Sequence, residues 1–139
     1  MKVRVWTASL ALLLLAAQVV QGAAAMERTF SAPVDRVWSA TEAVLKHLGW
    51  DVDKADRSIG FITTDSRRVD GDNYGVYEKA LRHRLRLTVK AAGDSRTVVG
   101  VERSVFKRER ILFVDKDEPV NDNSQDVEKA VLDAIGKAL

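Results

Sequence analysis

Residues 30–64 read FSAPVDRVWSATEAVLKHLGWDVDKADRSIGFITT, and this stretch decides the fold of the chain. Apolar residues recur between Val34 and Leu48 at the i, i+3, i+4, i+7 spacing of one buried helical face. Charged residues fall outside that stripe. The pattern therefore predicts an amphipathic helix that buries Trp38.

Both ends of this helix carry recognisable signals. Ser31 or Ala32 can sit at the N-cap with Pro33 in the first turn, where its missing N–H costs nothing. Gly49 can end the helix, because glycine takes the left-handed cap conformation without penalty.

Strand-like segments lie on either side of the helix. After it, residues 50–53 alternate apolar and polar side chains, and residues 59–64 are rich in β-branched and aromatic residues. The segment 56–58 between them has turn composition, so the two runs predict a hairpin. Thr29 and Phe30 before the helix predict an earlier strand.

Residues 1–25 are predicted to be a signal peptide. Lys2 and Arg4 form a positive start, an apolar run follows, and small residues end at Ala25, where we expect cleavage. The alternative, an uncleaved anchor, has an apolar run shorter than the roughly 20 residues that a bilayer needs. We therefore expect a periplasmic protein with no stable membrane anchor after cleavage.

The remaining residues, 26–139, are predicted to form one domain. Without the two basic residues of the signal peptide, 20 basic residues face 20 acidic ones. This balance gives no global electrostatic reason to bind nucleic acid, so no nucleic-acid partner is predicted. The chain has no cysteine, so no disulfide can stabilise it in an oxidising compartment.

Residues 65–80 predict a long exposed loop, because they are rich in charges, glycine and other breakers. Arg67, Arg68, Tyr74 and Tyr77 lie within it. Arginine and tyrosine recur as anchors in binding sites, so this loop is the predicted partner-binding surface, with a disordered connection as the alternative.

Residues 81–91 predict a strand whose apolar residues alternate with cations. Arg82, Arg84 and Arg86 share one face, which would extend the partner-binding surface toward an acidic partner. With no aromatic side chains expected between them, a solvated sheet face is the plainer interpretation.

A turn at residues 93–95 follows this strand and sets its pairing with the next one. A three-residue loop places Val89 opposite Val99 and opposes Arg86 to Glu102. A two-residue loop would set an apolar side chain against Glu102. We therefore predict the three-residue register.

The last third of the chain is less regular. The segment 107–110 mixes charges and predicts a surface turn or strand end, and the pairing of residues 111–114 stays open. Residues 115–123 predict a polar loop. A cap among residues 122–124 then opens a last amphipathic helix that continues to residue 138.

This layout resembles a known family. FSAPVDRVW, then GWDV, then IGFITT, a strand of alternating arginines and a terminal amphipathic helix are similar to the helix-grip domains of BamC (NlpB)-type envelope proteins and small exported bacterial proteins like them. The resemblance covers most of residues 27–139. It implies an α+β fold of order β-α-β-β-β-β-α, with two helices on one face of an antiparallel sheet. It also implies a non-enzymatic role in outer-membrane protein assembly or envelope maintenance.

No catalytic site, metal site or cofactor is predicted, because His47 and His83 have no cysteine or second histidine at ligand spacing. Two functions remain. One is an interaction module that binds an envelope protein, and the other is a carrier that holds a small apolar ligand between sheet and helix. A carrier keeps a cavity there, whereas an interaction module fills the space. The side chains expected to fill it are Trp38, Leu45, Phe61, Leu87 and Val101.

Overall fold

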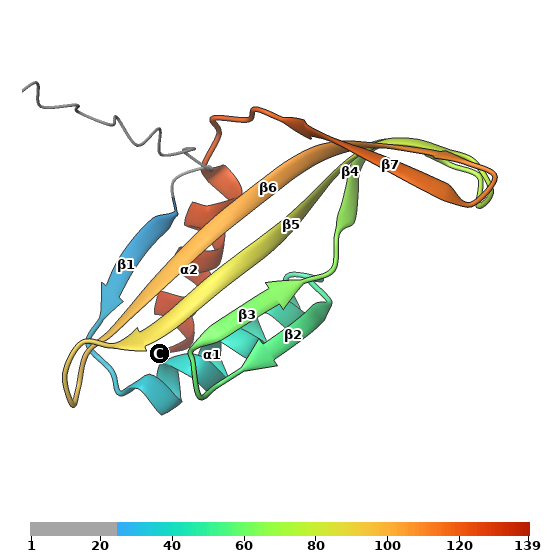
Figure 1. Cartoon of the computed structure of the whole chain (residues 1–139). Helices are drawn as coiled ribbons and strands as arrows, with labels where there is room; N and C mark the ends of the chain where they lie inside the picture. The colour runs from blue at the N-terminus through green and yellow to red at the C-terminus, as the bar shows by residue number, and fades with distance from the viewer. Residues whose placement is uncertain (1–24) are drawn as a thin grey trace, which may run out of the picture.

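The computed structural model describes residues 25–139 and contains two helices and one antiparallel sheet of seven strands (Figure 1). The elements, in chain order, are β1 (Met26–Phe30), α1 (Val34–His47), β2 (Val52–Asp56), β3 (Phe61–Thr64), β4 (Arg67–Asn73), β5 (Glu78–Ala91), β6 (Thr97–Ile111), β7 (Val114–Val120) and α2 (Asp126–Ala138). The predicted α+β class is confirmed, although the sheet has two strands more than the predicted five.

The predicted signal peptide, residues 1–25, lies outside the described residues except for Ala25. β1 begins at the next position. Among residues 25–139, no helix has both the length and the hydropathy needed to cross a membrane.

The sheet has two parts that share their longest strands. In the first part, here called the body, the strand order is β1-β6-β5-β3-β2, and α1 and α2 pack on one face (Figure 1). In the second part, here called the arm, β4 pairs with residues 78–83 of β5, and β7 pairs with residues 105–111 of β6. β5 and β6 run through both parts, so the arm is a continuation of the body sheet that projects beyond the helices (Figure 1).

α1 forms where the apolar periodicity predicted it. The helix begins after Pro33, whose carbonyl accepts the N–H of Val37 at 3.1 Å, so the expected caps at Ser31 or Ala32 lie outside it. Gly49 follows the helix with a φ of +82°, which confirms its role as the stop.

The core lies between the body sheet and the two helices. Its side chains come from α1 (Val37, Trp38, Val44 and Leu45), from α2 (Val131, Leu132 and Ile135) and from the sheet (Ile62, Leu85, Leu87, Val99 and Val101). Phe61, which we expected among them, lies on the opposite face, because strand alternation gives the inward position to its neighbour Ile62. The space between sheet and helices is thus filled by packed side chains.

The predicted register of β5 and β6 is confirmed. Val89 lies opposite Val99 and Arg86 opposite Glu102. The N–H of Ala92 donates to the carbonyl of Arg96 at 2.8 Å and closes the three-residue loop. The hairpin of β2 and β3 also forms as predicted.

Two segments predicted as loops are strands of the arm. Residues 65–80 contain β4, a turn and the start of β5, and Gly71 sits beside a register shift with a φ of +96°. A Cβ at Gly71 would lie 2.4 Å from the carbonyl oxygen of Lys79, so only glycine fits there. Residues 115–123 are mostly β7, an edge strand that tolerates Pro119.

The end of the chain needs two smaller corrections. Residues 107–110 lie inside β6 rather than at a turn, because β7 pairs with them. α2 begins at Asp126, later than the expected caps at residues 122–124. In that segment Asp122 instead accepts the backbone N–H of Ser124 at 2.9 Å.

Candidate functional site

The arm ends in two hairpin turns that lie side by side. Residues 74–77 join β4 to β5, and residues 112–113 join β6 to β7. The N–H of Phe113 donates to the carbonyl of Val76 at 3.3 Å, and the Arg110 guanidinium donates to the carbonyl of Gly75 at 3.2 Å. These two hydrogen bonds hold the turns together, so that they form the end of the arm jointly.

Exposed apolar side chains gather at this end. Six of the nine large apolar side chains that are exposed among residues 25–139 belong to the two turns and the positions next to them. They are Tyr74, Tyr77, Ile111, Leu112, Phe113 and Val114, here called the apolar tip. Exposed apolar side chains that gather in one place mark interaction sites, whereas singly scattered ones are ordinary. The apolar tip is therefore the candidate functional site.

The turn between β6 and β7 is built from residues that disfavour its backbone conformation. Ile111 pairs with Val114, which leaves Leu112 and Phe113 as a two-residue loop with φ of 50° and 66°. Such loops normally use asparagine and glycine, because both central residues need a positive φ. Leu112 and Phe113 are nevertheless 64% and 76% exposed, so no packing in the folded chain offsets the strain. Strain of this kind often marks a functional segment.

Replacing the strained pair should therefore stabilise the protein. Leu112→Asn with Phe113→Gly, here called the tip variant, should raise the free energy of unfolding by about 1–2 kcal/mol, because a left-handed conformation costs bulky residues about that much. Chemical denaturation measures the change. Alanine at both positions keeps a Cβ and should bring no comparable gain. An equal gain from alanine would show that backbone strain is not the cause.

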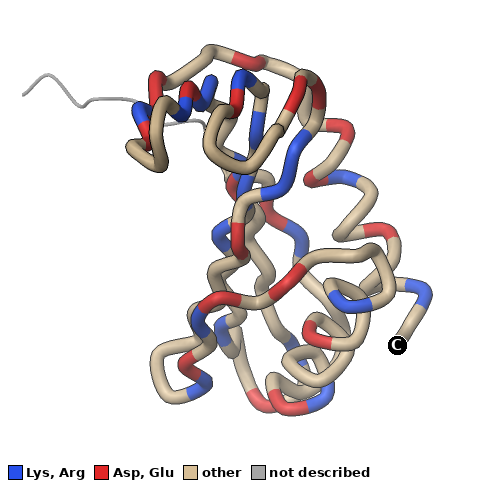
Figure 2. Tube along the Cα trace, turned by 90° about the vertical axis from the view of Figure 1, so that its right-hand side faces the viewer, with Lys and Arg blue, Asp and Glu red and all other residues tan. Residues whose placement is uncertain are grey.

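Charged residues begin one step behind the apolar tip. Asp72 pairs with Lys79, Lys79 with Glu109, and Glu109 with Lys116, so one row across the four strands alternates in sign. Figure 2, in which the end of the arm faces the viewer, shows both signs interleaved along the arm and its turns free of charge.

The opposite face of the arm carries a compact ion-pair network. The carboxylate of Glu78 is buried and lies 2.6 Å from the Arg82 guanidinium and 3.4 Å from that of Arg110. Arg110 also contacts Asp115 at 2.6 Å, and this hydrogen bond is the main reason that the pKa of Asp115 lies below its ordinary value. Arg108 lies 2.8 Å from Asp117. The acidic groups of this face are thus compensated within the arm.

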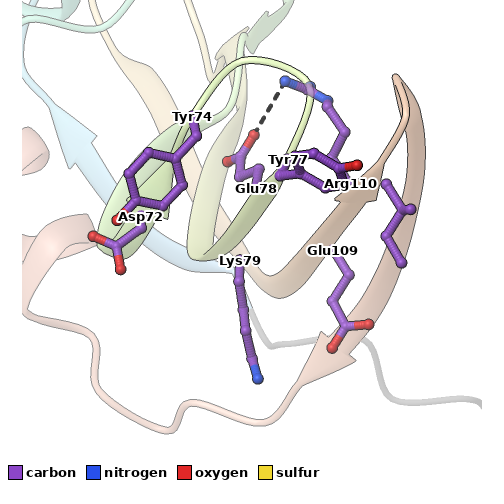
Figure 3. A pocket seen from close by; sticks show the side chains of 8 residues that line it. Asp72, Tyr74, Tyr77, Glu78, Lys79, Glu109 and Arg110 are labelled. Carbon is purple, nitrogen blue, oxygen red and sulfur yellow. Dashed lines mark ion pairs between the residues drawn. The ribbon is translucent and has the colours of Figure 1, made fainter.

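A depression of about 390 Å³ lies beside the apolar tip (Figure 3). The side chains around it are those of Asp72, Tyr74, Tyr77, Glu78, Lys79, Glu109, Arg110 and Ile111. Glu78 and Arg110 point toward one another within it (Figure 3). Five of these eight residues are charged, and they surround the apolar surface that Tyr74, Tyr77 and Ile111 contribute.

The predicted site residues separate into four places. Tyr74 and Tyr77 belong to the apolar tip. Arg67 has a different role: its guanidinium lies 3.7 Å from the centroid of the Trp50 ring and donates to the carbonyl of Leu48 at 2.9 Å. Arg82 is likewise occupied, with Glu78 and with Ser66. Arg67 and Arg82 therefore hold the arm to the body.

Arg84 and Arg86 lie on the open face of the sheet, away from the helices, and both are exposed. Each stacks on an aromatic ring: Arg84 lies 4.8 Å from the centroid of Phe106, and Arg86 lies 5.8 Å from that of Phe61. The expectation that aromatic side chains are missing from this face was wrong, because neighbouring strands supply them. Arg68 is exposed on β4 and pairs with Arg82 across the strands, apart from the two turns.

His83 lies at the junction of arm and body. Its ring nitrogens face two arginines, with Arg67 Nε 3.3 Å from Nε2 and Arg103 Nη1 3.4 Å from Nδ1. Burial is the largest cause that lowers the pKa of His83 from 6.5 to about 4, and the charges of Arg67 and Arg103 add to it against an opposing effect of Asp122. His83 is therefore neutral at pH 7.

Stability should fall as His83 is forced to bind a proton. Between pH 6.5 and 4 the unfolded chain binds this proton and the folded chain does not, so acidification favours unfolding, by up to about 3 kcal/mol across that window. Urea denaturation at a series of pH values measures this loss. His83→Gln should flatten the curve between pH 6.5 and 4, whereas an unchanged slope would assign the loss to other groups.

Four of the six residues of the apolar tip, Ile111, Leu112, Phe113 and Val114, were not among the predicted site residues. Residues 111–114 read ILFV, an apolar run that predicts a buried strand as readily as an exposed turn. The charged residues on both sides of the run were the available signal. Within the described part of the chain, no cluster of histidine and carboxylate side chains has the grouping of a metal site.

The sequence was compared with protein-family models and with curated proteins, and neither comparison gave a match.

Proposed function

We propose that this protein is an exported, non-enzymatic interaction module of the bacterial cell envelope, which contacts its partner through the apolar tip. One observation carries the proposal: six exposed apolar side chains are gathered at the end of an arm of four hydrogen-bonded strands. The arm continues the two longest strands of the body sheet, so it can hold these side chains away from the helices while the body supports it.

Two further features support this role. The strained turn at Leu112 and Phe113 keeps two apolar side chains exposed at the end of the arm, although a polar pair would suit the backbone better. The resemblance to BamC-type proteins adds the setting, which is outer-membrane assembly or envelope maintenance in the periplasm. The carrier alternative lacks such support, because the space between sheet and helices is occupied by the core.

Crosslinking in intact cells tests the proposal. The tip variant should lose most of the crosslinked envelope partner while keeping its fold, because the substitution relieves strain and removes no buried contact. Ile59→Asn is the matched control, since Ile59 is a similarly exposed apolar residue on the turn between β2 and β3. Its capture should be unchanged.

A competing surface is tested in the same assay. Arg84→Glu with Arg86→Glu reverses the charge of the open sheet face and leaves the apolar tip intact. If capture collapses in this variant and persists in the tip variant, the binding face is the open sheet face and the proposal for the apolar tip is wrong.

A further inference from the structure

We infer that the apolar tip inserts into the surface of a phospholipid bilayer, an inference that rests on the proposed role of the tip as the contact site. A bilayer, unlike a protein partner, has layers of fixed polarity, and the arm can be compared with these layers. Its polarity changes with depth in a fixed order, from charged headgroups through an interfacial layer that favours tyrosine to apolar acyl chains.

The arm shows the same order along its axis. Leu112 and Phe113 form the end of the arm together with the neighbouring turn, whose Val76 carbonyl accepts the N–H of Phe113. Tyr77 and Ile111 come next. The charged row that contains Lys79 lies behind them on one face, and Glu78 with its arginine partners lies behind them on the other. A protein interface needs no such stratification on both faces of the arm.

The spacing of these layers also matches a bilayer interface. Glu109 lies three residues before Leu112 on β6, and Lys116 lies three residues after Phe113 on β7. Three residues of a strand span roughly 10 Å at the usual antiparallel rise. Interfacial segments bury their apolar side about 5–10 Å into the boundary between headgroups and acyl chains. On the other face Arg110 and Asp115 lie two residues from the turn, roughly 7 Å at the same rise. Insertion of the tip to about that depth would leave both sets of charges at headgroup depth.

The charges of the arm suit a zwitterionic surface. The row from Asp72 to Lys116 holds two acidic and two basic residues in alternation. On the other face, arginines compensate Glu78 and Asp115. The end of the arm thus carries little net charge, so the inserted state needs no anionic lipid and should be nearly insensitive to salt.

The position of the helices argues against a broad protein surface or a second copy as the occupant. Strand alternation puts Tyr77 of the tip on the same sheet face as Leu85 and Leu87, which α1 and α2 cover in the body. A flat partner laid on that face would meet the helices first. The projecting arm can reach a bilayer end-on without the helices touching it (Figure 1). Attachment through so few side chains should be reversible, because even a single myristoyl chain binds a membrane only marginally.

A tryptophan reporter tests the insertion. Protein purified after export is used, with its first residue established by intact mass, since retention of residues 1–25 would itself contact lipid. Phe113→Trp should shift its fluorescence to the blue with phosphatidylcholine vesicles and should be quenched by lipids brominated in the acyl chain. Ile59→Trp places the same reporter on an exposed position of the body and should show neither effect.

Co-sedimentation with the same vesicles measures the contribution of the tip. The tip variant should lower the partition coefficient about a hundredfold, because two apolar side chains no longer enter the bilayer. Low and high salt should give similar partition coefficients for the unmodified protein. Binding that requires anionic lipid and persists in the tip variant would overturn the inference, because it would assign attachment to surface cations.

The remaining outcomes separate this inference from the proposed function. If vesicles fail to bind the protein while the tip variant still loses its crosslinked partner, the occupant is a protein, and only the bilayer inference fails. If sedimentation equilibrium shows a dimer that the tip variant abolishes, the occupant is a second copy, which also overturns it. If the tip variant changes neither vesicle binding nor crosslinking, both proposals fail.

Discussion

Trp38→Ala is expected to lower the free energy of unfolding by about 3–5 kcal/mol, the usual loss when a buried aromatic side chain is removed from a core. Trp38 is 4% exposed and packs in the cluster formed by α1, α2 and the body sheet. A small domain has about 5–15 kcal/mol of stability in total, so this single change removes a large share.

Arg36→Ala is the matched control on the same helix. Arg36 is exposed on α1 and donates a hydrogen bond to the carbonyl of Leu139. An exposed contact of this kind contributes little, so the variant should unfold close to the unmodified protein. Chemical denaturation compares the two. Equal losses would show that the assignment of the buried helical face is wrong.

Arg103→Ala is expected to cost a similar amount for a different reason. Arg103 and Glu128 are 7% and 4% exposed, and Arg103 Nε lies 3.7 Å from Glu128 Oε2. Removing one partner of a buried pair leaves the other charge uncompensated, which costs about 3–5 kcal/mol. Arg103 also contacts Asp122 at 2.6 Å, so the path from β7 into α2 should loosen as well.

The double variant Arg103→Met with Glu128→Leu separates charge from packing. Neither Arg103 Nε nor Glu128 Oε2 has a hydrogen-bond partner among the described residues, so the pair is imperfectly satisfied. Replacing both with apolar residues of similar size should recover most of the stability lost in Arg103→Ala. If urea denaturation finds the double variant as unstable as the single one, the uncompensated charge does not explain the loss.

The body of the fold could be predicted because its elements bury one side. α1 carries a clear apolar stripe, and β5 alternates apolar and polar residues along the half of the strand that lies in the body. The β5–β6 register followed from pairing Val89 with Val99 and charge with opposite charge. In each case the pattern of the residues records which side faces the core.

The arm could not be predicted in the same way, because its outer strands bury almost nothing. β4 and β7 are exposed nearly throughout, so neither has a period-two pattern. Their strand conformation comes from pairing with β5 and β6, and tertiary pairing of this kind overrides local propensity. Tyr74 and Tyr77 were predicted from residue type, whereas Leu112 and Phe113 become candidates only once their exposure is known.

The pairing of β1 with β6 has a consequence for the order of folding. The β5–β6 hairpin joins neighbouring segments, so it can form early, when only a short loop has to close. β1 must wait for Thr97–Val101 on the far side of that hairpin, and α2 contributes Leu132 and Ile135 from the last residues of the chain. The hydrophobic core therefore closes only after β1, the β5–β6 hairpin and α2 have come together.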